Sequence, residues 1–208
     1  MPAQRAEWEL RTLSEKRDRL IKVVEEKGLL ELSAPVELAS GDHSRFFVDG
    51  KRALASGADL RLACETIIEI ANENGIEFDA VGGLTLGADQ FAHGVALISG
   101  CEWFVVRKAP KGRGTNQRIE GSRLDAGTRV LLVDDVVTRG GSIEQAYDVI
   151  REETGATVTG AITLVDRGSD AARSFFKRVG IPYCPLVTHD ELGIPAVGSE
   201  HFEPAATS

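Results

Sequence analysis

The sequence predicts an α/β fold in which helices flank a mainly parallel sheet. Short apolar runs alternate with segments of helical periodicity over the last two thirds of the chain, as in strands joined by right-handed helical crossovers. Several of these runs end in polar residues, as strands do at the edge of a parallel sheet where ligands bind. The 208 residues, 42% of them hydrophobic, suffice for one domain with a sizeable core.

The N-terminal part precedes this alternation. Residues 4–27 combine spaced apolar side chains with many charges, which predicts an amphipathic helix that Gly28 ends. Residues 29–53 show β-type alternation interrupted by a Ser-Gly-Asp-His-Ser segment, which predicts strands joined by a turn. Residues 57–74 return to helical spacing, and Gly75 is the expected stop.

The alternating region follows. Its expected strands lie at residues 80–84, 103–106, 130–133, 157–165 and 181–187. Its expected helices are one that runs to about residue 98, one over 143–150 that Gly155 closes, and one over 169–179. Residues 109–127 contain hardly any large apolar side chain, which predicts a long exposed loop. The chain from residue 193 onward is expected to be partly loose.

The charge distribution limits the possible ligands. A net charge of -8 argues against a nucleic-acid partner, because binding a phosphate backbone needs a basic face. One short segment is basic nevertheless, with Glu120 as its single acid, and it suggests a compact anionic ligand. Its cations are Arg107, Lys108, Lys111, Arg113, Arg118 and Arg123.

The composition favours a cytoplasmic protein without a membrane partner. No apolar run approaches the roughly 18 residues of a transmembrane helix. The start of the chain is too charged for a signal peptide. The three cysteines are widely spaced and form no C-x-x-C pair, so they are expected to be buried thiols in a reducing compartment.

Residues 129–142, RVLLVDDVVTRGGS, carry the chemistry. An apolar strand is followed by Asp134 and Asp135, where the strand is expected to end, and then by a glycine-containing turn that opens a helix. A helix N-terminus offers unpaired N–H groups to an anion, so two carboxylates beside it suggest a ligand with hydroxyls and phosphate. The strand and acids alone are also typical of a magnesium site in P-loop proteins, but neither a P-loop nor a dinucleotide fingerprint occurs in the sequence.

The string D-D-V-x-T-x-G-x-S resembles the phosphoribosyl-pyrophosphate signature of the type I phosphoribosyltransferases. Three further stretches, ELASGDHSRFFVDGK, VGGLTLGAD and FVVRKAPKGRG with IEG, resemble the orotate phosphoribosyltransferases, and together with VDRG they fall in the family's order. The resemblance implies the type I phosphoribosyltransferase fold with a small N-terminal hood. It divides a single domain, 1–208, into an N-terminal helix and hood (1–53), a core (54–190) and a tail (191–208).

The resemblance also implies a reaction. The 5-phosphoribosyl group of phosphoribosyl pyrophosphate would pass to orotate, giving orotidine 5'-monophosphate and pyrophosphate in de novo pyrimidine biosynthesis, with Mg²⁺ as cofactor and without a direct protein ligand for the metal. The residues expected in catalysis are Asp134, Asp135, Lys108 and Lys111. Those expected to bind phosphoribosyl pyrophosphate are Arg107, Lys108, Lys111, Arg113, Asp134, Asp135, Val136, Val137, Thr138, Arg139, Gly140, Gly141 and Ser142. Those expected at orotate are Thr138, Arg167, Phe47 and Val48.

Four positions depart from the family's pattern. Arg113 stands where the lid usually has histidine, Ala39 where many members have lysine, Gln90 where proline is usual, and Leu86 where some members have a ligand-binding lysine. Two alternatives therefore stay open: a related phosphoribosyltransferase that uses another base, or a non-catalytic regulator that senses phosphoribosyl pyrophosphate. The resemblance further implies a homodimer in which the lid of one subunit reaches the partner's active site.

Overall fold

The computed structural model describes residues 12–110 and 117–199. Its centre is a six-stranded sheet of order β5-β4-β3-β6-β7-β8, parallel except for β5, which runs antiparallel to β4. The strands are β3 (Ala80–Leu84), β4 (Glu102–Val106), β5 (Ile119–Gly121), β6 (Arg129–Val137), β7 (Thr157–Asp166) and β8 (Tyr183–Thr188). The predicted fold class is confirmed.

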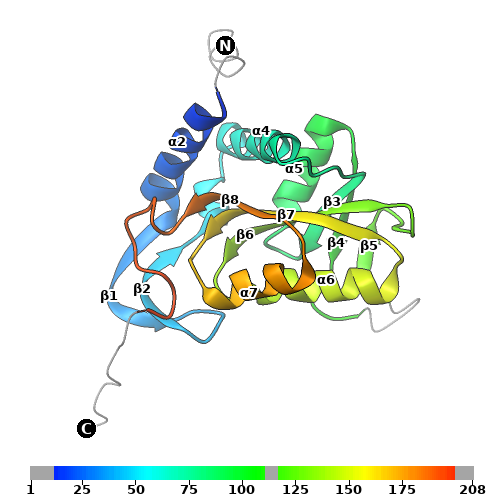
Figure 1. Ribbon diagram of the computed structural model, residues 1–208. Helices are drawn as coiled ribbons and strands as arrows, with labels where there is room; N and C mark the ends of the chain where they lie inside the picture. Colours follow the sequence, from blue (N-terminus) through cyan, green and yellow to red (C-terminus); the bar gives the residue numbers. More distant parts are fainter. Residues whose placement is uncertain (1–11, 111–116, 200–208) are drawn as a thin grey trace.

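Helices cover both faces of this sheet. Figure 1 shows α4 (Gly57–Glu73) and α5 (Asp89–Ser99) on one side, and α6 (Gly141–Glu153) and α7 (Asp170–Val179) on the other. Successive side chains of β6 point to opposite faces of the sheet. Leu131 belongs to the core under α4 and α5, whereas Leu132 belongs to the core under α6 and α7. The connections from β3 and β6 leave in opposite directions along the sheet, so a topological switch point lies between these two strands.

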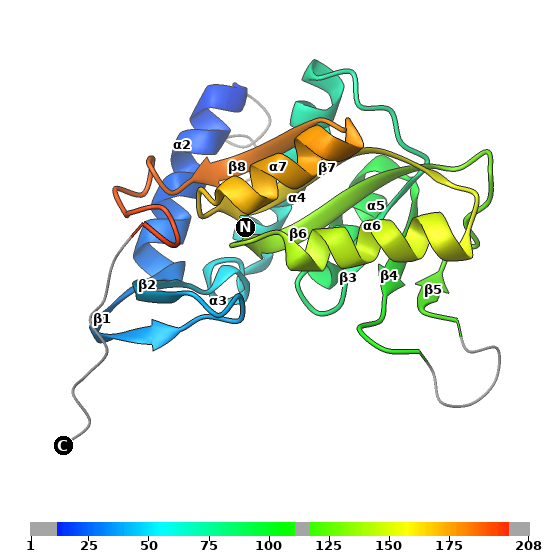
Figure 2. The ribbon, with the colours of Figure 1, turned by 60° about the horizontal axis from the view of Figure 1, so that its bottom comes forward.

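The N-terminal part forms a separate layer at the β8 side. It comprises α2 (Leu13–Val23), a π-helical turn η1 (Val24–Gly28), the antiparallel pair β1 (Leu29–Glu37) and β2 (His43–Val48), and the one-turn helix α3 (Gly50–Ala53). We call β1, β2 and α3 the hood (Figure 2). Strand alternation was expected through residue 53, and this is wrong for α3. The Asp49 side chain accepts a hydrogen bond from the N–H of Arg52 and so begins a helix there.

One further expectation needs correction. The segment 109–127 is not wholly a loop, because Ile119 to Gly121 add a strand to the edge of β4. The described part of the tail, 193–199, packs against the body: Ile194 and Val197 are buried, and the N–H of Val197 donates to the carbonyl of Arg167. Within the described ranges, no helix has the length and apolarity needed to cross a bilayer.

Candidate active site

The acidic pair lies inside β6 and not after it, which corrects the expected strand end. The strand runs on to Val137 because it stays paired with β7, through Val136 with Val165 and Val137 with Asp166. Pairing with β3 stops earlier, at Gly82 with Leu132. Asp134 and Asp135 therefore sit just beyond the point where β3 and β6 separate, at the switch point.

The loop after β3 crosses directly over the two carboxylates. A Cβ atom at Gly87 would overlap Oδ1 of Asp134 and lie 2.9 Å from Oδ1 of Asp135. Only glycine lets the backbone of this loop approach so closely. The preceding peptide bond, between Thr85 and Leu86, is cis. The segment predicted as a glycine turn is thus one wall of the site.

Burial and the charge of a neighbour act on the carboxyl of Asp134. Asp134 is 5% exposed, and its burial together with the neighbouring charge of Asp135 raises its pKa to about 7. Its Oδ1 accepts a hydrogen bond of 3.0 Å from the N–H of Asp135, which partly offsets that rise. The carboxyl of Asp134 consequently changes its charge close to neutral pH.

Lys51 of α3 supplies a countercharge that the sequence interpretation did not assign. Its Nζ forms an ion pair with Oδ2 of Asp135. Burial lowers the pKa of Lys51, but the hydrogen bond and the charge of Asp135 more than offset this, so the pKa lies above its usual value. Lys51 thus stays protonated beside the acids.

The turn after β6, predicted to bind an anion, leads directly into α6, and we call it the cradle. Gly140 has a φ of 85° and is the residue that precedes α6, where it also packs against Ala172. A side chain would be strained in this conformation. Gly141 and Ser142 are exposed and form the first turn of α6, where backbone N–H groups have no partner within the helix. Thr138, half-buried, completes the turn.

Arg139, within this turn, reaches the hood. Its Nε donates to Oδ2 of Asp42 at 2.7 Å, and its second nitrogen pairs with Oδ1 of the same carboxylate. The hydrogen bond from Arg139 holds the pKa of Asp42 below its usual value. The Ser40 hydroxyl also donates to Asp42, at 2.9 Å. The turn between β1 and β2 is therefore fixed to the cradle.

The basic segment is only partly described. Arg107, at the end of β4, pairs with Glu120 of β5 at 3.1 Å. Lys108 is exposed, and its charge acts on Asp134. Arg118 donates to the carbonyls of both Arg107 and Lys108, so it fixes the backbone here. Lys111 and Arg113 lie outside the described residues.

Arg167 lies beneath the hood at the end of β7. Its side chain is 1% exposed, and one terminal nitrogen donates to the carbonyl of Phe46 at 2.9 Å. The other lies 3.4 Å from the hydroxyl of Ser44. Of the two neighbours predicted at the base, Phe47 is 40% exposed, whereas Val48 is buried in the core. The structure thus brings Arg167 to the predicted strand β2, with Phe46 as its direct partner.

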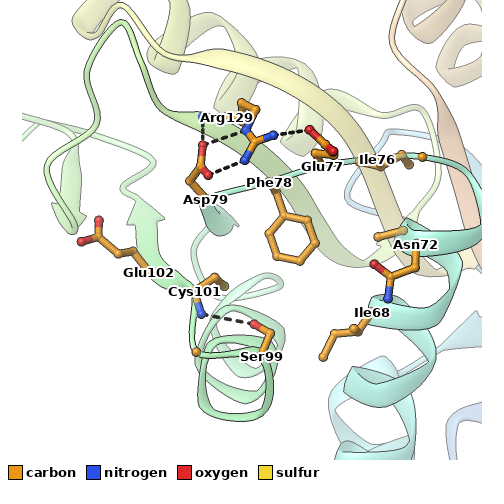
Figure 3. Close-up of a pocket in the computed structure, with 13 residues that line it drawn as sticks. Ile68, Asn72, Ile76, Glu77, Phe78, Asp79, Ser99, Cys101, Glu102 and Arg129 are labelled. Carbon is orange, nitrogen blue, oxygen red and sulfur yellow. Dashed lines mark hydrogen bonds and ion pairs between the residues drawn. The ribbon is translucent and has the colours of Figure 1, made fainter.

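A second cleft lies at the opposite end of the sheet and contains none of the predicted residues. It has a volume of about 710 Å³ and opens between the C-terminal ends of α4 and α5 (Figure 3). Arg129, at the start of β6, is paired there with Glu77 and Asp79. Two carboxylates therefore already neutralise this guanidinium within the cleft.

The chain is similar to known proteins over most of its length. The phosphoribosyl transferase domain family matches residues 53–187. An orotate phosphoribosyltransferase of Pyrococcus furiosus is 37% identical over 176 residues, 85% of this chain and 94% of that protein. One of Streptomyces avermitilis is 36% identical over 183 residues, 86% of this chain and 97% of that protein. The structure of Mycobacterium tuberculosis H37Rv orotate phosphoribosyltransferase in complex with 5-phospho-alpha-D-ribosyl 1-diphosphate has a TM-score of 0.70 at 30% identity, covering 86% of this chain and 99% of that one.

Proposed function

The chain belongs to the orotate phosphoribosyltransferases of the phosphoribosyl transferase family, and from this premise we propose how its switch-point site performs the reaction. The enzyme transfers the 5-phosphoribosyl group of phosphoribosyl pyrophosphate to orotate, which yields orotidine 5'-monophosphate and pyrophosphate in pyrimidine biosynthesis. The observation that carries the site assignment is the acid pair Asp134 and Asp135, enclosed between the Gly87 loop and the cradle before α6.

The 5'-phosphate binds in the cradle. Thr138 to Ser142 surround it with N–H groups and hydroxyls, and the N-terminal end of the 13-residue helix α6 adds a favourable dipole. Val136 and Val137 support this turn through their pairing with β7. Arg139 adds a positive charge close to the phosphate while it remains attached to Asp42 of the hood.

The ribose lies over the acids. Asp134 and Asp135 accept hydrogen bonds from its 2' and 3' hydroxyls, which places the anomeric carbon at the centre of the site. As the bond to pyrophosphate breaks, positive charge develops on the ribose ring, and the nearby carboxylates stabilise it. The pKa of about 7 at Asp134 makes this contribution depend on pH, since only the ionised carboxylate is fully effective.

The leaving pyrophosphate is neutralised by the basic segment. Lys108 lies close enough for its charge to act on Asp134, which supports a position at the diphosphate. Arg107 would exchange its half-buried partner Glu120 for the substrate. We assign the same role to Lys111 and Arg113, from the sequence alone.

Mg²⁺ is the proposed cofactor, and the donors present fit it. Mg²⁺ prefers hard oxygen ligands and keeps several waters, so it is commonly held by one or two carboxylates together with substrate phosphates. No direct protein ligand is expected, so substrate oxygens and waters would hold the ion, and the carboxylates of Asp134 and Asp135 would accept hydrogen bonds from those waters. When bound with the diphosphate, the ion supplies charge neutralisation of the leaving group.

Orotate is placed at the hood, against Arg167 and Phe47. The planar guanidinium of Arg167 suits the orotate carboxylate. Because Arg167 is almost fully covered, it would exchange the Phe46 carbonyl for this carboxylate as β2 moves. The exposed ring of Phe47 then borders the base, Val48 anchors the strand in the core, and Thr138 reaches the base from the cradle.

We also propose a cytoplasmic homodimer. Leu97 of α5 is 88% exposed and Trp103 of β4 is 40% exposed, so a partner subunit would cover apolar surface beside the basic segment. In this arrangement the loop that follows β4 reaches the partner's site. Size-exclusion chromatography with light scattering measures the mass, and a monomer at all concentrations contradicts the dimer.

The function is tested by following orotate absorbance with phosphoribosyl pyrophosphate and Mg²⁺. Loss of the orotate signal is expected, and no change at micromolar enzyme would refute the assignment. A panel of other bases, measured in parallel, tests whether Ala39, Gln90 and Arg113 accompany a different acceptor. Binding of phosphoribosyl pyrophosphate without turnover of any base would instead indicate a sensor.

A further inference from the structure

Lys51, in helix α3 of the hood, contacts one of the two acids directly. Its ammonium group pairs with Oδ2 of Asp135, although the two residues are 84 positions apart. The Lys51 side chain is 50% exposed, whereas that of Asp135 is only 14% exposed. The lysine therefore approaches the acid from the solvent side, which is the side from which a substrate must enter.

The backbone of α3 fixes this approach. A Cβ atom at Gly50 would lie 3.0 Å from the Cβ of Asp135 and 3.3 Å from a methyl group of Leu164. Helix α3 therefore approaches β6 and β7 closely at Gly50, which has no side chain. Figure 2 shows α3 beside the sheet. Asp49 holds its first turn through the N–H of Arg52. Lys51 therefore reaches the acids from α3, which is packed against the sheet.

The pair is easily exchanged. The lysine partner is half-exposed, so water partly screens the pair and lowers its net contribution to stability. The lysine stem has four rotatable carbons, so its ammonium group can move several ångströms without any change in α3. Once ribose hydroxyls donate to Asp135, that carboxylate needs the ammonium group less, and an anion beside the ribose becomes the better partner.

We propose that Lys51 is a substrate-binding residue: it neutralises Asp135 in the free enzyme and transfers its ammonium group to the diphosphate of phosphoribosyl pyrophosphate when the ribose occupies the acids. This inference rests on the proposed function of the site. It adds a cation from the hood to those of the basic segment, so that the diphosphate is held from two sides.

Calorimetric titration of two ligands tests it. Phosphoribosyl pyrophosphate carries the diphosphate and ribose 5-phosphate does not, so Lys51→Ala is expected to weaken only the first, by about tenfold or more, as for loss of a charge-assisted hydrogen bond. Lys51→Arg should recover part of this affinity. Arg52→Ala is the matched control, because it removes the same charge from the exposed face of the same helix.

The possible results of the titrations distinguish the role of Lys51 from the proposed function of the site. Unchanged affinity of Lys51→Ala for phosphoribosyl pyrophosphate, or equal weakening of both ligands, overturns the role of Lys51 and leaves the proposed function intact. A wild-type enzyme that binds neither ligand contradicts the proposed function itself. Thermal unfolding of each variant excludes loss of fold as the cause, and Lys51→Met, which keeps the apolar stem, replaces alanine if that variant unfolds early.

Discussion

Arg139 of the cradle and Asp42 of the hood form an ion pair between residues 97 positions apart in the chain. Two other contacts join the hood to the same edge of the sheet: Lys51 with Asp135, and Arg167 with the carbonyl of Phe46. Each contact uses a residue assigned to a different part of the substrate, namely the 5'-phosphate, the ribose and diphosphate, and the base. We therefore expect the position of the hood to depend on occupancy of the site.

The Arg139–Asp42 pair predicts that the free energy of unfolding falls at acidic pH. The lowered pKa of Asp42 means that its stabilising contribution is present above its unfolded value of 3.8 and is lost as pH falls further, through the folded pKa. Asp42→Asn should therefore unfold about 1 kcal/mol more easily at pH 7, since the arginine partner is 58% exposed and screened. Below the folded pKa of Asp42 the variant and wild type should converge.

Chemical denaturation at a series of pH values measures this convergence. Asp18→Asn, at an exposed position of α2, is the control and should show no such difference. A constant gap between Asp42→Asn and wild type at every pH would mean that the ion pair is not its source.

The raised pKa of Asp134 predicts that stability changes with pH in the opposite direction. Because its folded pKa is about 7, the native state binds more protons than the unfolded state between about pH 4 and pH 7, so this group lowers stability as pH rises through that range. Asp134→Asn keeps the acceptor for the N–H of Asp135 and removes the buried charge. It should be more stable than wild type by on the order of 2 kcal/mol at pH 8 and lose most activity.

Thermal unfolding from pH 5 to pH 8.5 follows the difference between the two proteins. The gain of Asp134→Asn should grow with pH and then level off above the pKa. A variant that is less stable than wild type at pH 8 would contradict the assignment of a buried, repelled carboxylate. Binding of phosphoribosyl pyrophosphate to wild type should strengthen over the same range, as Asp134 becomes charged.

Replacement of Gly87 by alanine is predicted to lower activity through a steric clash. Alanine there would place a methyl group on Oδ1 of Asp134, so either the loop or the acid must shift. Displacement of this order at reacting groups costs roughly two orders of magnitude in kcat/KM. Gly57→Ala is the control, because open space surrounds that position at the start of α4 and activity should not change. Equal activity of the two variants would show that the loop is not a wall of the site.

The sequence predicts the residues of this site that are neighbours in the chain. Residues 129–142 contain strand, acids, turn and helix start in order, so local spacing is enough to assign them. Lys51 and Phe46 were missed as partners because their contacts join residues 84 and 121 positions apart, which depends on how the hood packs on the sheet. The strand β5 was missed for a related reason, because its three residues are ordered by β4 and not by their own pattern.

Arg167 provides the sharpest test of the base site, since it holds the carbonyl of Phe46 in this structure and is proposed to exchange that carbonyl for orotate. Arg167→Lys keeps the charge but cannot make two parallel hydrogen bonds, so KM for orotate should rise on the order of 30-fold. KM for phosphoribosyl pyrophosphate should change little, because Arg167 lies under β2 and the cradle does not contain it. Arg173→Lys is the control: it is 56% exposed on α7 and pairs with Asp170. Steady-state kinetics with each substrate varied in turn separates the two constants. If instead both KM values rise together while the unfolding temperature falls, Arg167 serves to hold the hood and the base is bound by other groups.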